Sequence, residues 1–158
     1  MSEAVFDRIR ALLEHCDSSY NVIDHPETFT SEQSAIARGE PLQNGGKALL
    51  MKADSAFVLA VIRADQKLDS RKLQRALNSR KLRFASREEL AAQTGGLMPG
   101  SVPPFGPPVF EFSLYVDEQV TRNDRIAFNA GMLTRSVVMP LADYLRATNP
   151  IVADFSAV

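Results

Sequence analysis

Lys47 is the side chain in this sequence best placed to do chemistry. It follows two glycines in "GGKALLMK" (45–52), where the chain enters an apolar segment typical of a strand. Because pockets form at the ends of sheet strands, an ammonium there could hold a phosphate or polarise an ester as a compact charge. The alternative is an ordinary strand-end lysine in solvent. A phosphate-binding loop is excluded, because Ala48 replaces the required Ser or Thr and a strand follows instead of a helix.

Three further motifs each have two interpretations. The stretch "PGSVPPFGPP" (99–108) is half proline, so it is neither a helix nor a central strand, and it forms either a linker or a rigid wall around a binding site. His25, which precedes Pro26 at the end of an expected strand, is either a turn residue or a site residue. The stretch "NAG" at 129–131 is either a turn that uses the positive φ of glycine or a place where the backbone approaches a ligand closely.

The common catalytic and metal-binding motifs are missing. The only histidines are His15 and His25, and Cys16 is the only cysteine, so no metal-ligand set is recognisable. There is no nucleophile elbow and no dinucleotide-binding glycine pattern. Cys16 is predicted to be buried rather than nucleophilic. We therefore expect no metal and no cofactor, and an enzyme of this composition would work by positioning and electrostatics.

Basic residues are concentrated in one part of the chain. Residues 63–87 carry nine Lys or Arg against two Asp, although the whole chain has a net charge of −1. Such a concentration is typical of a protein that binds a polyanion such as nucleic acid. The alternative is a well-solvated helix face.

The helix predicted at 70–78 would present part of this basic stretch to solvent. Its apolar side is expected to bury Leu73, Ala76 and Leu77. Arg71 and Arg75 then lie on the opposite, exposed stripe.

The hydrophobic pattern predicts helices and strands in a mixed order. Strands at 47–53 and 56–62 are expected to form a hairpin, and the first of them, apolar on both faces, is expected in the centre of a sheet. The other helical segments are 3–15, 28–39, 86–96 and 140–148, and the other strands are 20–25, 109–117, 125–131 and 136–140. This order predicts an α+β fold with a mixed, curved sheet or partial barrel flanked by helices.

Length and composition limit the class of protein. With 158 residues, of which 45% are hydrophobic, the chain is expected to form a single domain, 1–158. No apolar run approaches the roughly 20 residues of a membrane span, and the N-terminus mixes acidic and basic residues, unlike a signal peptide. With one cysteine, the protein is expected to be cytoplasmic.

Six motifs, in this order, resemble the YbaK/prolyl-tRNA-synthetase-associated domain family of aminoacyl-tRNA deacylases. They are His25, "TSEQSAIARG" (30–39), "GGKALLMK" (45–52), "LRFASREEL" (82–90), "GLMPGSVPPFG" (96–106) and "IAFNAG" (126–131). The resemblance covers roughly residues 20–147. It implies the mixed-sheet α+β editing-domain fold and an autonomous trans-editing enzyme. Such an enzyme hydrolyses the ester that links a wrong amino acid to the 3′ end of a tRNA.

The resemblance also implies roles for individual residues. The family lysine falls on Lys47, as the catalytic residue, and the family GxxxP loop falls on Gly100, Ser101, Val102, Pro103 and Pro104. This loop would line a small substrate pocket. A loop fixed by prolines loses little entropy on binding, which would explain its stiffness.

Other residues are expected to complete the binding surface. His25, Asn129 and Gly131 would belong to the substrate site, and Phe105 would either stack on the tRNA 3′ end or pack in the core. The basic stretch would bind tRNA phosphates, with Arg71, Arg75, Arg80 and Lys81 as the expected contacts.

Two departures from the family leave the amino acid open. Ser101 stands where some members have a second glycine, and "FNAGMLTRS" (128–136) replaces a His-Pro pair common in members that remove alanine. The expected substrate is therefore a small amino acid of the alanine, serine, threonine or cysteine type on tRNA, with tRNA-Pro the expected tRNA. Prolyl-tRNA synthetase is a candidate partner.

Two other classes of function stay open. One is a non-catalytic accessory protein that binds tRNA or a synthetase, because a fold can persist after its chemistry is lost. The other is a small-ester hydrolase unrelated to RNA. Retention of both the lysine and the loop argues against the first, and the basic cluster argues against the second.

Overall fold

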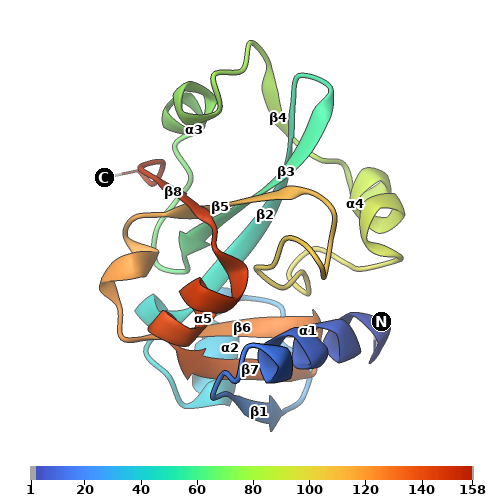
Figure 1. Ribbon diagram of the computed structural model, residues 1–158, viewed down its shortest axis with the longest axis vertical. Coiled ribbons are helices and arrows are strands. Elements are labelled where there is room, and N and C mark those ends of the chain that lie inside the picture. The colour runs from blue at the N-terminus through green and yellow to red at the C-terminus, as the bar shows by residue number, and fades with distance from the viewer. Residues whose placement is uncertain (1–2, 158) are drawn as a thin grey trace.

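The computed structural model describes residues 3–157 (Figure 1). Its helices are α1 (Glu3–His15), α2 (Ser31–Arg38), α3 (Ser70–Leu77), α4 (Arg87–Thr94) and α5 (Leu141–Thr148), with short 3₁₀-helices η1 (Leu42–Asn44) and η2 (Val120–Arg122). Its strands are β1 (Asn21–Asp24), β2 (Gly46–Ala53), β3 (Ala56–Arg63), β4 (Leu82–Phe84), β5 (Ser113–Asp117), β6 (Arg125–Met132), β7 (Arg135–Pro140) and β8 (Ile151–Ala153).

The strands form two sheets. The five-stranded sheet has the order β4-β2-β3-β5-β8, with antiparallel pairing of β2 to β3 and β4 and parallel pairing of β5 to β3 and β8. The three-stranded sheet has the antiparallel order β1-β7-β6. A parallel bridge between Gly45 and Ala127 joins the start of β2 to β6. The α+β class with mixed pairing is confirmed, but the strands form two sheets that meet rather than a closed barrel.

The position of β2 explains its uninterrupted apolar sequence. Leu50 belongs to the larger hydrophobic cluster, together with Ile9 of α1 and Phe128 of β6. Met51, the next residue, belongs to a second cluster with Leu73 of α3. Because successive side chains of a strand point to opposite faces, β2 is covered on both sides, as predicted.

Glycine is required where the two sheets meet. A β-carbon on Gly46 would lie 2.8 Å from Cδ1 of Ile126, and one on Gly45 would lie 2.8 Å from Cβ of Ala64. Both distances are too short for a real contact, so a larger residue at position 46 would force Ile126 of β6 to shift, and one at position 45 would crowd Ala64, which directly follows β3. Gly46 therefore lets the start of β2 lie against β6, one residue before Lys47.

Local capping sets the bounds of α2. The hydroxyl of Thr30 accepts a hydrogen bond from the backbone N–H of Gln33 at 3.1 Å. Gly39 adopts a left-handed conformation with φ 68° and ends the helix. Arg38 is consequently the last helical residue.

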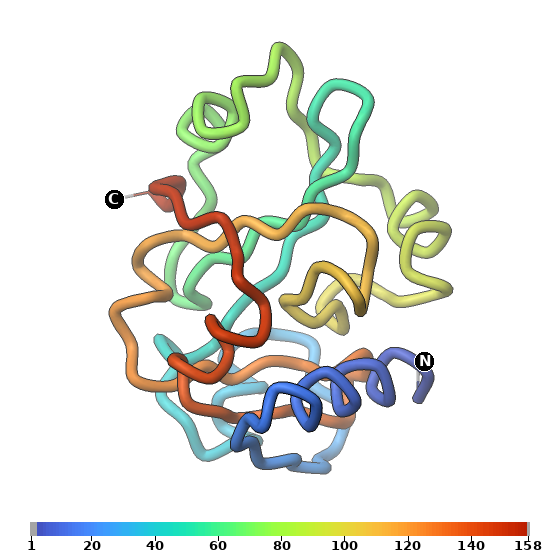
Figure 2. Tube along the Cα trace, viewed as in Figure 1, coloured from blue at the N-terminus to red at the C-terminus, as the bar shows by residue number. Residues whose placement is uncertain are grey.

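The proline-rich segment belongs to the core and is not a linker. Residues 101–106 are all buried, and the trace shows the segment between α4 and β5, close to the three-stranded sheet (Figure 2). The ring of Phe105 meets those of Phe128 and Tyr144 edge to face, with centroids 5.3 and 5.7 Å apart. The Tyr144 hydroxyl donates to the carbonyl oxygen of Pro104 at 2.6 Å. Burial raises the pKa of Tyr144, so the hydroxyl keeps its proton and fastens α5 to the segment.

The strand predicted at 109–117 begins only at Ser113. The N–H groups of Val109 and Phe110 both donate to the carbonyl oxygen of Gly106, at 2.9 and 3.0 Å, so the chain turns there. Val109, Phe110 and Phe112 are all buried, which breaks the two-residue alternation of a strand.

Three other predictions differ from the structure. Ala76 is exposed, whereas Leu73 is buried as predicted. The three-residue strands β4 and β8 were not predicted, because each takes its structure from the strand beside it. The strand predicted to end at Gly131 continues to Met132. Among the described residues, no helix is long and apolar enough to cross a lipid bilayer.

Tyr144→Phe should lower the free energy of unfolding by about 1–2 kcal/mol, because the buried carbonyl oxygen of Pro104 loses its partner. Urea unfolding measures this. The matched control is Tyr20→Phe, whose hydroxyl bonds Glu14 at the surface and which should change stability by less than about 0.5 kcal/mol. Equal losses in the two variants would contradict the role of Tyr144 as a brace.

Candidate active site

Lys47 is the second residue of β2 and lies opposite Ile62 of β3. Its side chain is exposed. Among residues 3–157, no carboxylate or other acceptor holds its ammonium group. The charge is therefore available to a ligand.

The junction of the sheets brings the start of β2 to the middle of β6. Gly45 and Ala127 are partners in the parallel bridge. Lys47 lies two residues after Gly45, and Asn129 lies two residues after Ala127. The chain therefore runs from the bridge towards Lys47 and towards Asn129 in the same direction. Asn129 is also the residue that contacts the GxxxP loop.

Strand β6 holds the GxxxP loop through two hydrogen bonds. The Asn129 side chain donates from Nδ2 to the carbonyl oxygen of Gly100 at 2.6 Å. The N–H of Gly131 donates to the carbonyl oxygen of Ser101 at 3.0 Å. Gly100 has φ 88° and Gly131 has φ 89°, so both positions use a conformation that other residues rarely adopt. The structure thus brings together the predicted loop, Asn129 and Gly131.

A bulge in β6 makes these contacts possible. The pairing of β6 with β7 shifts register between Asn129 and Met132. Such bulges re-aim side chains and are frequent beside active sites. The close backbone approach at 129–131 is to the loop itself.

A polar cluster lies behind Asn129. Arg38 donates from Nε to Ser136 Oγ at 2.9 Å and from Nη2 to Asn129 Oδ1 at 3.0 Å. His25 places Nε2 2.8 Å from Ser136 Oγ and Nδ1 2.9 Å from the carbonyl oxygen of Pro26. Because a carbonyl can only accept, Nδ1 carries a proton, and the single hydroxyl proton of Ser136 is shared between two acceptors, His25 Nε2 and, at 3.3 Å, Asn129 Oδ1. His25 therefore supports the cluster with both ring nitrogens engaged.

Arg38 and Ser136 were not predicted from the sequence. Burial lowers the pKa of Arg38 to about 10, which still leaves the guanidinium charged at neutral pH. The sequence indicates the role of Arg38 only weakly, because all it shows is an arginine at the end of a helix, directly before the glycine that caps the helix. Such a residue is usually solvated.

The side chains of Phe105 and Ser101 in the loop are engaged within the protein. Phe105 is fully buried among aromatic rings, so the predicted stacking on a tRNA base is wrong and the core alternative is correct. The hydroxyl of Ser101 bonds the carbonyl oxygen of Met98 at 2.7 Å. Within the described part of the chain, the N–H of Val102 has no acceptor. Val102 itself is buried.

Two surface hollows lie elsewhere. One, of about 550 Å³, is lined by residues around Tyr20 and Arg125, and the other, of about 580 Å³, is lined by Arg71, Gln74, Arg75, Asn78 and Ser79. Neither includes Lys47 or the GxxxP loop. The pocket predicted along the loop therefore remains a prediction.

The four predicted tRNA contacts share exposure and lack of an opposite charge. These contacts are Arg71, Arg75, Arg80 and Lys81, and in residues 3–157 none of them forms an ion pair. By contrast, Arg83 pairs with Glu89 at 2.7 Å. The second hollow borders Arg71 and Arg75, so free cations surround a depression on α3.

Side chains that could hold a metal do not converge. The described residues contain no group of three or more His, Cys, Asp or Glu arranged to bind an ion. Cys16 is half-buried at the end of α1. The expectation that no metal takes part stays a prediction.

The sequence model of a family described as the aminoacyl-tRNA editing domain matches residues 25–147. The chain belongs to this family. The multifunctional Ser/Thr-tRNA deacylase ProXp-y of Escherichia coli K12 is 35% identical over 155 residues, covering 94% of this chain and 90% of that protein. The proline–tRNA ligase of Shouchella clausii is 33% identical over 105 residues, which is 66% of this chain and 18% of the ligase.

Solved structures share the fold. One described as a candidate trans-editing enzyme for prolyl-tRNA synthetase covers 100% of both chains with a TM-score of 0.85 at 24% identity. The hypothetical protein APE2540 covers 95% of this chain with a TM-score of 0.84 at 20% identity. The family, the fold and the class of enzyme predicted from the sequence, a hydrolase acting on aminoacyl-tRNA, are thus confirmed.

Gly100→Val should slow single-turnover deacylation by at least about tenfold, equivalent to about 1.4 kcal/mol of transition-state stabilisation. A β-carbon there would contact only Leu133, at 3.8 Å, so the effect comes from backbone strain at φ 88°, which would shift the loop carbonyl away from Asn129.

The matched control for this variant is Gly95→Val, at a glycine with φ 75° that has open space around it and ends α4. Both variants should lose about 1–3 kcal/mol of stability from strain. Only Gly100→Val should lose activity, and full activity in that variant would contradict the role of the loop.

Proposed function

We propose that this protein is a trans-editing deacylase that hydrolyses the ester of a mischarged small amino acid on tRNA, with tRNA-Pro as the expected tRNA. The observation that carries the proposal is an unpartnered ammonium, that of Lys47, at the sheet junction where Asn129 holds the GxxxP loop. A free positive charge on the strand that meets the loop-bearing β6 suits an ester that is already activated.

The relatives support serine and threonine as the first substrates to test. The Escherichia coli relative is named a Ser/Thr-tRNA deacylase. Proline–tRNA ligases carry a similar segment, which supports tRNA-Pro as substrate and prolyl-tRNA synthetase as partner. We extend the proposal to the cytoplasm as the compartment, because aminoacyl-tRNA is made and used there.

The chemistry needs few groups. A water molecule, assisted by a ribose hydroxyl of the substrate, attacks the ester carbonyl carbon; the bond between that carbon and the ribose oxygen breaks, and a proton from the water passes to that oxygen. The ammonium of Lys47 stabilises the negative charge that develops on the carbonyl oxygen. The free N–H of Val102 is a second candidate donor. After water completes the hydrolysis, the products are the free amino acid and the tRNA 3′ hydroxyl.

A rigid wall explains selection by size. The loop is buried from Ser101 to Gly106 and is held by Asn129, Gly131 and Tyr144. A wall that cannot move excludes large side chains, as in double-sieve editing. Among the substrates admitted, one methylene is worth only about 1–3 kcal/mol, so discrimination within this group is modest.

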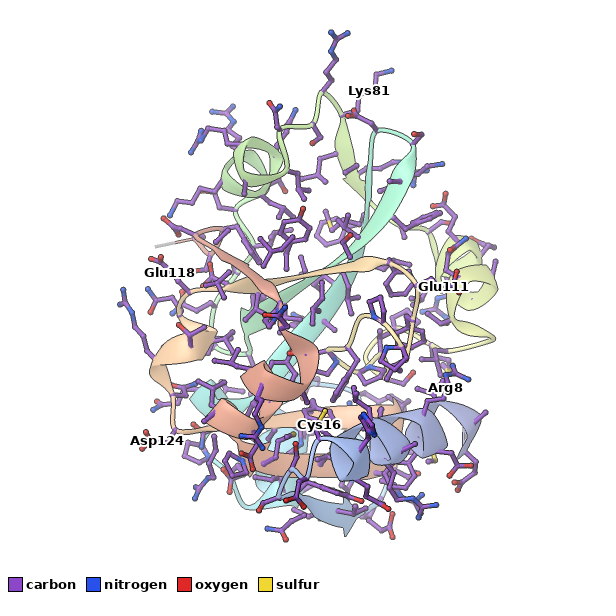
Figure 3. All side chains as sticks on the ribbon, in the orientation of Figure 1. Arg8, Cys16, Lys81, Glu111, Glu118 and Asp124 are labelled. Carbon is purple, nitrogen blue, oxygen red and sulfur yellow. The ribbon has the colours of Figure 1, made fainter. Side chains whose placement is uncertain are left out.

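Lys47 and the free cations lie towards opposite ends of β2. Beyond the strand, the carboxylate of Asp54 accepts from the N–H groups of Arg80 at 3.0 Å and Lys81 at 2.9 Å. Figure 3 shows Lys81 at the far tip of the molecule. Lys47 and Ala53 are separated by about 20 Å along the strand, at about 3.3 Å per residue. A short single-stranded 3′ end spans such a distance, which lets the ester reach Lys47 while stem phosphates meet the cations.

The decisive experiment is a deacylation panel with the purified protein. tRNA-Pro charged with alanine, serine, threonine or cysteine is incubated with enzyme, and release of the amino acid is followed against proline-charged tRNA. Hydrolysis of at least one mischarged tRNA, with proline spared, supports the proposal. Binding of tRNA without hydrolysis would favour the non-catalytic accessory protein instead.

Lys47→Ala should lower the single-turnover rate constant by at least about a hundredfold, because one electrostatic donor to a developing oxyanion contributes about 10²–10³. The matched control is Lys52→Ala on the same strand, whose ammonium lies over the ring of Phe57. That variant should keep its activity. Near-wild-type turnover of folded Lys47→Ala would refute the catalytic assignment.

Arg71→Glu combined with Arg75→Glu should weaken tRNA binding and reduce the slope of log affinity against log salt by roughly 1.5, for two lost phosphate contacts. Filter binding across a salt series measures both. The control with the same change in charge is Arg10→Glu with Arg122→Glu, at residues that already pair with acids. If both double variants bind alike, the basic stretch is only a solvated surface.

A further inference from the structure

Arg38 joins three segments that are distant in the sequence. It leaves the end of α2 and donates to Ser136 on β7 and to Asn129 on β6, and Asn129 donates in turn to the carbonyl oxygen of Gly100. We propose that Arg38 is a positioning residue that orients the Asn129 amide and, through it, the Gly100–Ser101 peptide of the GxxxP loop. The consequence for catalysis rests on the proposed deacylase function.

The chemistry of the partners fixes the orientation of Asn129. A guanidinium offers only donors, and a backbone carbonyl only accepts. With the amide reversed, its NH₂ would face the donors of Arg38 and its oxygen would face the oxygen of Gly100. Two hydrogen bonds would become two repulsive contacts, so Arg38 and Gly100 select the same orientation from opposite sides. Without Arg38, the amide oxygen loses its charged donor and keeps only the longer hydrogen bond from the Ser136 hydroxyl, at 3.3 Å, so the amide is held less firmly against the loop.

Stability alone does not account for this buried arginine. Within the part of the chain that the structure describes, no carboxylate lies within ion-pair distance of Arg38. Glu40, two residues away, pairs instead with Arg125 at 3.2 Å. Burial of the guanidinium is costly, and the nearby charge of Glu40 offsets only part of this cost, since the net effect still lowers the pKa of Arg38. The hydrogen bonds of Arg38 go instead to two neutral acceptors, Ser136 and Asn129, and Asn129 contacts the loop.

Arg38 also adjoins the start of the strand that carries Lys47. A β-carbon on Gly45 would lie 3.6 Å from Nη1 of Arg38, so the guanidinium rests beside the backbone at the sheet junction. One planar group therefore borders both parts of the site: the approach to Lys47 and the support of Gly100.

Fixing the orientation of the Gly100–Ser101 peptide group also restricts the next peptide group, Ser101–Val102. The carbonyl of Gly100 and the N–H of Ser101 belong to one planar group, so fixing the first fixes the second. The following peptide is held by Gly131, which donates to Ser101, and its other end is the free N–H of Val102. Arg38 thus sets the start of the segment that directs this N–H.

The first test needs no substrate. Arg38→Met keeps the apolar stem and removes the donors. Amide hydrogen exchange of the free protein should rise about tenfold at Ser101 and Gly131, whose N–H groups are bonded within the loop and to it. The N–H of Ala85, bonded to Leu50 in the other sheet, is the internal control and should not change. Unchanged exchange at Ser101 and Gly131 would overturn the proposal, whatever the activity.

The second test separates positioning from general damage. With enzyme in excess, Arg38→Met should lower the rate constant at saturation about tenfold while the half-saturating enzyme concentration stays within about twofold. A smaller folded fraction would do the reverse, raising the half-saturating concentration and sparing the rate constant. The control is Arg125→Met, which removes an arginine on β6 that pairs with Glu40. This variant should retain both the rate constant and the half-saturating concentration.

Two further variants test the route through Asn129. Arg38→Lys keeps the charge, but its single nitrogen lacks the planar fork by which Nε and Nη2 of Arg38 reach Ser136 and Asn129 separately, so activity should remain well below wild type. Arg38→Met combined with Asn129→Ala should be no slower than Asn129→Ala alone. Full activity of Arg38→Lys, or additive losses in the double variant, would overturn the proposal. If the wild type hydrolyses no aminoacyl-tRNA, the proposed function fails, and hydrogen exchange still decides the role of Arg38.

Discussion

The close contact between the start of β2 and β6 is the constraint on which the site depends. Gly46 lacks the β-carbon that would collide with Ile126 of β6. Gly45 lacks the one that would collide with Ala64 and approach the guanidinium of Arg38. The contact of the two strands sets Lys47 near the junction, while β6 holds the GxxxP loop. A larger residue at position 46 would crowd Ile126 and disturb this junction, even with every functional side chain still present.

The rest of the architecture serves to keep that loop still. Prolines restrict its backbone, Tyr144 bonds it from α5, and Asn129 and Gly131 bond it from β6. Such stiffness suits an aminoacyl ester, which needs no strong nucleophile. When the chemistry is easy, selectivity depends on which substrates fit, and a wall that yields by an ångström selects poorly. The stabilising contacts of the loop are therefore part of its function.

The features that depend on neighbouring residues could be predicted from the sequence. The cap of α2 at Thr30, the hairpin of β2 and β3, and the glycines before Lys47 all have local patterns. The role of Arg38 has none, because its partners lie 98 and 91 residues away and become neighbours only when the two sheets meet. The aromatic ring of Phe105 was ambiguous for a related reason: the sequence gives its size, whereas burial depends on Phe128 and Tyr144.

Basic residues with and without carboxylate partners have different roles in the proposed function, in which affinity for tRNA and selectivity among aminoacyl esters depend on different residues. Arginines such as Arg83, which have carboxylate partners, serve the fold, whereas Arg71, Arg75, Arg80 and Lys81 have none in residues 3–157. With a net charge of −1, the chain as a whole attracts no polyanion, so the attraction must be local. Lys47 lies about 20 Å along β2 from the hairpin end, beyond the Debye length of about 8 Å at physiological salt. The cations near that end and the lysine therefore act on a bound tRNA almost independently. Under the proposed function, changes in the basic stretch would tune how tightly tRNA binds without altering which ester the loop admits.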